Sequence, residues 1–155
     1  MKAALLYGST HGRTRKVVEE ILRRLVVLPD VVDVKTKPAP EKFADYETLL
    51  FCVPTYGDEE LQDDMEEFLR TFDLDLTGKR FAIAELGNYY GYDDYSFGAM
   101  AILRRRLLEL HATELCQPLS LDSLPKVNWD QLARWVDHLN IRLKSHDRPS
   151  NAAAN

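Results

Sequence analysis

The stretch Gly8-Ser-Thr-His-Gly-Arg-Thr14 decides how this chain folds. It follows the apolar run Ala3–Tyr7, which predicts a buried strand, and it leads into a helical pattern that begins near Arg13. A strand, a tight turn and a helix N-terminus together predict an anion site, because unpaired N–H groups and the helix dipole both favour negative charge there. The turn alone leaves one alternative open, a capped strand–helix connection without a ligand, since Ser and Thr are ordinary cap residues.

The spacing of the glycines narrows the class of ligand. A dinucleotide fingerprint needs G-x-G-x-x-G, whereas Gly8 and Gly12 are four positions apart and Lys35-Thr36-Lys37 stands where an acidic residue is expected. A nucleoside-triphosphate loop needs G-x-x-x-x-G-K-[ST], and this turn is one residue short, with Arg13 in place of the lysine. A mononucleotide phosphate held by N–H and hydroxyl groups fits the turn better.

Composition predicts one globular domain. The 155 residues are 45% apolar and 29% charged, and we expect a domain over residues 1–145 followed by a flexible tail over residues 146–155. No apolar run approaches the length of a membrane span, and Met1-Lys2-Ala3 opens into a strand rather than a secretion signal. Cys52 and Cys116 lie in apolar runs and predict buried free thiols, so we expect a cytoplasmic protein.

The net charge of −5 conceals a strongly acidic segment. Residues 43–69 contain no Lys or Arg and nine carboxylates, which are Asp45, Glu47, Asp58, Glu59, Glu60, Asp63, Asp64, Glu66 and Glu67. Such a field argues against a nucleic-acid partner and for a cationic protein partner, whose approach it would steer. The plainer interpretation is a solvated helix face.

The chain alternates between short apolar strands and amphipathic helices. The expected strands are residues 2–7, 31–35, 48–53, 80–85 and 112–117, and helical patterns lie between them and after the last. Asn128 is the expected N-cap of the final helix. This alternation predicts a doubly wound α/β sheet, in which ligands bind beyond the carboxyl ends of the strands. The loops after strands one, three and four should therefore converge.

The loops after strands three and four are rich in tyrosine and glycine. The first is Pro54-Thr55-Tyr56-Gly57-Asp58, and the second is Glu85–Tyr95, which has four tyrosines in its last seven residues. Such loops suit stacking on a flat ligand or a surface that binds a partner. Beside a phosphate turn, they indicate a planar ring attached to a phosphate.

These three segments resemble the flavodoxin family. Ser9–Thr14 is similar to the family's phosphate loop, [ST]-x-T-G-x-T, and Pro54–Asp58 is similar to its first flavin-flanking loop. Glu85–Leu103 aligns without gaps to the second loop, G-x-G-D-x-x-G-Y, and places Tyr92 at the stacking tyrosine. The chain departs from the family where Glu85 and Asn88 replace Gly and Asp, and where His11 and Arg13 replace neutral residues.

The resemblance implies a five-stranded parallel sheet in the order 2-1-3-4-5 with helices on both faces, and tight non-covalent FMN binding. The residues it assigns to FMN are Ser9, Thr10, His11, Gly12, Arg13 and Thr14 around the phosphate, Pro54, Thr55, Tyr56 and Gly57 along one face and edge of the ring, Leu86, Gly87 and Asn88 at the pyrimidine end, and Tyr92 on the other face.

The implied function is one-electron transfer between redox proteins, a reductase and an acceptor with basic docking surfaces, by a monomeric carrier that is not itself an enzyme. Two alternatives stay open. One is a flavodoxin-like scaffold or regulatory protein that binds FMN weakly, and the other is a small flavin-dependent reductase. We expect no membrane or nucleic-acid partner and no metal, because the histidines show no ligand spacing.

Overall fold

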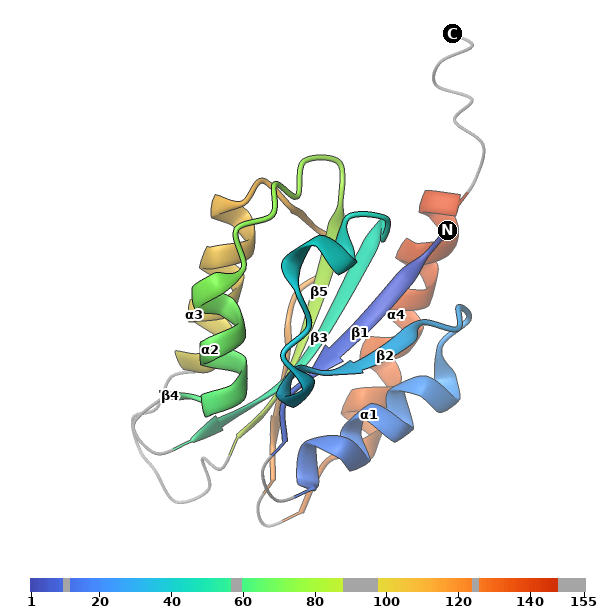
Figure 1. Ribbon diagram of the computed structural model, residues 1–155. Helices are drawn as coiled ribbons and strands as arrows, with labels where there is room; N and C mark the ends of the chain where they lie inside the picture. Colours follow the sequence, from blue (N-terminus) through green and yellow to red (C-terminus); the bar gives the residue numbers. More distant parts are fainter. Residues whose placement is uncertain (10–11, 57–59, 88–97, 124–125, 148–155) are drawn as a thin grey trace, which may run out of the picture.

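The fold is a parallel sheet covered by helices on both faces (Figure 1). The computed structural model describes residues 1–9, 12–56, 60–87, 98–123 and 126–147. The main strands are β1 (Ala3–Tyr7), β2 (Asp30–Asp33), β3 (Thr48–Tyr56), β5 (Arg80–Gly87) and β6 (Thr113–Glu114). They lie in the order β2-β1-β3-β5-β6 and pair in parallel. The predicted strand order 2-1-3-4-5 is confirmed.

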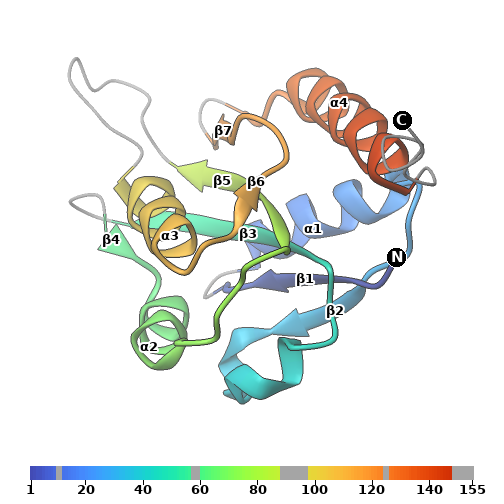
Figure 2. The same cartoon turned by 90° about the horizontal axis from the view of Figure 1, so that it is seen from above.

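Helices cover both faces of the sheet, as Figure 2 shows from above. One face carries α1 (Arg13–Arg24) and α4 (Trp129–Asp147), and the other carries α2 (Asp63–Thr71) and α3 (Gly98–Glu109). The link from β2 to β3 contains the 3₁₀ turns η1 (Val34–Thr36) and η2 (Pro40–Phe43). Helices on both faces follow from the parallel order, since each crossover must pass over one face.

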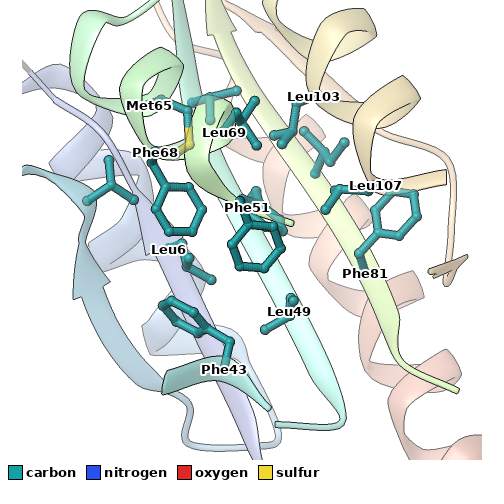
Figure 3. Close-up of a cluster of buried hydrophobic side chains, with 14 of the residues drawn as sticks. Leu6, Phe43, Leu49, Phe51, Met65, Phe68, Leu69, Phe81, Leu103 and Leu107 are labelled. Carbon is teal, nitrogen blue, oxygen red and sulfur yellow. The ribbon is translucent and has the colours of Figure 1, made fainter. Parts of the chain in front are cut away.

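The central strands are apolar on both faces, which explains why their sequence shows no alternation. Leu49, Phe51 and Val53 of β3 join the core beneath α2 and α3 (Figure 3), while Leu50 and Cys52 join the core beneath α1 and α4. A sheet buried on both faces requires such runs. The prediction that Cys52 and Cys116 are buried free thiols is confirmed.

The expected fifth strand is divided in two. Residues 113–114 form β6 beside Arg80 and Phe81, and β7 (Leu119–Asp122) resumes pairing with β5 at Ala84–Gly87. Pro118 has no N–H to give to a ladder, and the carbonyl of Gln117 accepts a hydrogen bond from Trp135 Nε1 at 2.8 Å. The chain therefore leaves the sheet and returns to it, and the expectation of one continuous strand over 112–117 was wrong.

Side chains explain the remaining boundaries. β2 ends at Asp33, two residues earlier than expected, where Asp33 Oδ1 accepts from the Lys35 N–H at 3.0 Å and begins η1. Asn128 caps α4 as predicted, since its Oδ1 accepts from the Gln131 N–H at 3.1 Å. That helix continues to Asp147, and residues 148–155 of the expected tail lie outside the described part of the chain. Within the described residues, no helix has the length and apolar character of a membrane span.

Candidate functional site

The carboxyl ends of β1, β3 and β5 lie side by side, toward the lower edge of Figure 1. Tyr7 at the end of β1 pairs with Cys52, and Pro54 near the end of β3 pairs with Leu86. β7 ends at the same edge, where Asp122 pairs with Gly87. The sheet therefore brings the segments after β1, β3, β5 and β7 to one edge, as expected for ligand binding in an open α/β sheet.

The turn after β1 is tightly packed on one side. A β-carbon built on Gly8 would overlap with the carboxamide oxygen of Gln62, so the backbone of this turn lies against the start of α2. Gly12 has a φ of 82°, a left-handed conformation that glycine adopts without strain, and its N–H donates to Ser9 Oγ at 3.0 Å. Ser9 and the two glycines thus shape the turn locally.

The first turn of α1 is strongly positive. It contains no acidic residue, and Arg13, Arg15 and Lys16 are all exposed there. Among the described residues, no side chain caps this helix, so N–H groups of its first turn remain available to a ligand. Thr14 is only 1% exposed, and its carbonyl lies 4.0 Å from the Cys52 thiol that donates to it. Thr10 and His11, also predicted phosphate ligands, lie outside the described residues.

A cavity of about 360 Å³ opens between the starts of α1 and α4. The described residues that line it are Arg13, Lys16, Leu86, Ser123, Val127 and Trp129. Of these six, Arg13 and Leu86 were among the predicted site residues. Ser123 and Val127 follow β7, and a doubly wound sheet places the loop after its last strand at the ligand-binding edge, which is a signal that the sequence could have given.

The exits of β3 and β5 form the other part of the site. Pro54 and Thr55 lie at the end of β3, and Leu86 and Gly87 lie at the end of β5. The Thr55 hydroxyl donates to Glu85 Oε1 at 2.5 Å. The backbone of Tyr56 pairs with Glu60 in the short antiparallel β4 (Glu60–Leu61). Gly57, Asn88 and Tyr92 lie outside the described residues.

Negative charge gathers on the neighbouring helix. The first turn of α2 carries Asp63, Asp64 and Glu66, and Asp63 and Glu66 are exposed. Gln62 caps this helix, its Oε1 accepting from the Met65 N–H at 3.0 Å. Acidic residues in this position complement the helix dipole, so part of this charge has a structural role. The edge is thus basic at α1 and acidic at α2.

The donors present fit a phosphate monoester. N–H groups of the first turn of α1, which no described side chain caps, the Ser9 hydroxyl and the cations of Arg13 and Lys16 supply hydrogen bonds and positive charge. The cavity beside them has an apolar part made by Leu86, Val127 and Trp129. The arrangement therefore suits a ligand with a charged end and an apolar body.

Comparison with known proteins points to one family. The family model described as Flavodoxin matches residues 5–135. A flavodoxin of Enterobacter agglomerans is 37% identical over 109 residues, which cover 64% of this chain and 61% of the relative. Flavodoxin 2 of Escherichia coli (strain K12) is 30% identical over 110 residues, 69% of this chain and 62% of the relative. The chain thus spans about three fifths of the length of these curated relatives.

Solved structures share the fold along almost the whole chain. Oxidised Flavodoxin 1 from Bacillus cereus superposes with a TM-score of 0.79 at 24% identity, covering 93% of this chain and 98% of that one. A Fusobacterium nucleatum flavodoxin bound to flavin mononucleotide gives a TM-score of 0.75 at 16% identity, covering 95% and 99%. At such identities the likeness concerns the fold.

Proposed function

Because the chain belongs to the flavodoxin family, we propose that it binds FMN without a covalent link and carries single electrons between redox proteins. Bound FMN supplies the one-electron chemistry, and the chain holds and shields it. The observation that carries the proposal is the first turn of α1, where Arg13 and Lys16 line a cavity together with Leu86 of β5, and where no described side chain caps the helix N-terminus.

Each described part of the site has a role in this proposal. Ser9, Arg13 and Lys16 bind the phosphate together with the N–H groups of α1. The main chain of Thr55 and of Leu86 borders the ring at the exits of β3 and β5. The roles of Thr10, His11, Gly57, Asn88 and Tyr92 rest on the family resemblance.

The acidic side of the site is the proposed docking surface for a basic reductase and a basic acceptor. Asp63 and Glu66 are exposed on α2 next to the carboxyl edge of the sheet, and complementary charge accelerates the encounter of such partners. We propose that the carrier is a monomer in the cytoplasm; the location agrees with the two free buried cysteines, since free thiols are typical of reducing compartments.

Binding of FMN and of riboflavin, measured by quenching of flavin fluorescence, tests the proposal. Riboflavin lacks the phosphate, so the wild-type protein should bind FMN more tightly. Arg13→Ala should weaken FMN binding by roughly 10- to 100-fold, the range for a hydrogen bond to a charged group, and leave riboflavin binding almost unchanged. The matched control is Arg23→Ala, because Arg23 lies in the same helix, far from the site, and pairs with Glu20 at 2.7 Å.

The alternatives predict different results. A wild-type protein that binds FMN only weakly would overturn the electron carrier and favour a scaffold or regulatory role. Turnover of NAD(P)H by the isolated FMN-loaded protein would favour a reductase. An equal loss of FMN affinity in Arg13→Ala and Arg23→Ala would contradict the proposal that Arg13 binds the phosphate.

A further inference from the structure

Two rows of buried apolar side chains, one on β3 and one on β5, each end in a polar residue. On the face covered by α2 and α3, the row of β3 runs through Phe51 and Val53, and the row of β5 runs through Phe81 and Ile83. Since side chains alternate along a strand, the next residues on this face are Thr55 and Glu85. Glu85 is fully buried and Thr55 is 9% exposed. A carboxyl group therefore stands at the end of an apolar core.

The two residues are joined by a short hydrogen bond. The Thr55 hydroxyl donates to Glu85 Oε1 at 2.5 Å, a length typical of a hydroxyl bound to a carboxylate. Burial of either group without such a bond would destabilise the fold, because neither could then bond to water. This hydrogen bond can form only when the exits of β3 and β5 are side by side.

The hydrogen bond between Thr55 and Glu85 lies where the main chain can form fewer hydrogen bonds between β3 and β5. Thr55 follows Pro54, the last residue of β3 that pairs with β5, and Pro54 has no N–H to donate to a neighbouring strand. The register of β3 against β5 ends with the pairs Val53–Glu85 and Pro54–Leu86. A side-chain bond from Thr55 to Glu85 extends the link between the two strands one residue beyond the proline.

We propose that Thr55 and Glu85 are a positioning pair, which holds the two flavin-flanking exits together before the ligand binds. The pair keeps the starts of both loops at a set spacing, so binding does not have to order them. Its link to the flavin rests on the proposed function, whereas its effect on the strand ends does not. Glu85 in place of the glycine usual in the family becomes, on this proposal, a functional substitution.

Hydrogen exchange in the FMN-free protein tests the effect on the strand ends. Thr55→Val keeps the shape of the side chain and removes the hydroxyl. The amides of Leu86 and Gly87 should then exchange about tenfold faster, which corresponds to about 1.4 kcal/mol of local opening free energy. Thr55→Ser retains a hydroxyl and should restore slow exchange. The matched control is Thr48→Val, since Thr48 is also buried in β3 but lies at its opposite end.

FMN titration tests the effect on binding. Thr55→Val should weaken FMN binding by about tenfold, and Thr55→Ser and Thr48→Val should bind within about twofold of the wild type. Should Thr55→Val fail to fold, Glu85→Gln replaces it in both measurements. Glu85→Gln should weaken FMN binding by about threefold, less than Thr55→Val, because an amide oxygen accepts a hydrogen bond more weakly than a carboxylate.

The outcomes separate this inference from the function. If the wild type binds no FMN but Thr55→Val still opens the strand ends, the electron-transfer proposal fails and the structural pair stands. If the wild type binds FMN and Thr55→Val binds it equally well, the positioning role is wrong and the proposed function stands. Equal exchange rates of the Leu86 and Gly87 amides in Thr55→Val and Thr48→Val would also contradict the positioning role of Thr55 and Glu85.

Discussion

Gly8 lies directly against the side chain of Gln62, so the turn after β1 and the start of α2 share one packed contact. A β-carbon at position 8 would overlap with Gln62 Oε1, and its next neighbours are Gln62 Cδ at 3.1 Å and Met65 Cβ at 3.6 Å. The same oxygen accepts from the Met65 N–H, and Gln62 Nε2 donates to Asp64 Oδ2 at 2.8 Å. The glycine at this position is required by packing.

Gly8→Ala should therefore displace the cap of α2 and lower the free energy of unfolding by roughly 1–3 kcal/mol, the usual cost of overpacking. Urea unfolding measures the change. A double-mutant cycle supplies the control, because Gln62→Ala removes the obstructing oxygen. In that background, Gly8→Ala should lower the free energy of unfolding by less than it does in the wild type. Additive effects of the two substitutions would contradict the packing argument.

Gly12 is required for a different reason. Its φ of 82° is left-handed, and among the described residues other than its chain neighbours, a β-carbon there would meet no atom within 4 Å. Gly12→Ala should lower the free energy of unfolding by about 1–2 kcal/mol through backbone strain alone. Gly12→Asn should lower the free energy of unfolding by less, since asparagine tolerates the left-handed conformation. Thermal unfolding of the two variants measures the difference, and an equal loss in both would contradict the strain argument.

Cys116 makes the free energy of unfolding depend on pH in the alkaline range. Burial raises the pKa of its thiol from 9.0 to about 11, and the neighbouring Glu114 adds to the shift. Above about pH 9 the unfolded chain releases this proton while the folded chain retains it, so the free energy of unfolding falls as the pH rises towards 11. Two pKa units correspond to roughly 2–3 kcal/mol.

The control for this prediction is Cys116→Ala, compared with the wild type by urea unfolding at about pH 8 and about pH 10. The substitution should make the loss of stability with pH smaller, whereas other titrating groups contribute equally to both proteins. Burial also raises the pKa of Cys52, so a smaller pH dependence should remain. Identical pH dependence in the two proteins would rule out a contribution from Cys116.

The acidic surface of α2 should govern the encounter with a basic partner. Glu66→Lys should slow electron transfer from the reduced, FMN-loaded protein to cytochrome c, a basic one-electron acceptor, by several-fold at low salt. The difference should shrink as salt screens the charges. Asp137→Lys is the matched control, since Asp137 is exposed on α4, on the opposite face of the sheet. Equal slowing by both substitutions, measured by stopped flow, would indicate net charge rather than a docking surface.

Much of the fold could be predicted from local sequence patterns. Apolar runs such as Leu49–Val53 marked the buried strands, and helical periodicity marked the four helices, because both signals report which side of an element avoids water. The division of the last strand was missed, since it depends on the hydrogen bond that the Gln117 carbonyl accepts from Trp135, 18 residues further along the chain.

The assignment of the turn from Gly8 to Thr14 to a phosphate stays a prediction from its residues. Trp129 came into view only through the packing of α4 beside α1, which brings it to the cavity. Residues that face a cavity from distant elements leave no local period, so the sequence does not mark them as a group.

By itself the sequence determined the parallel sheet and the alternation of its main strands with helices, because propensity and apolar periodicity act over a few neighbouring residues. Only the tertiary structure decided that Gly8 must leave room for Gln62 and that Glu85 bonds to Thr55. Those relationships depend on strand register and on how a helix packs, which are set by contacts between residues far apart in the chain.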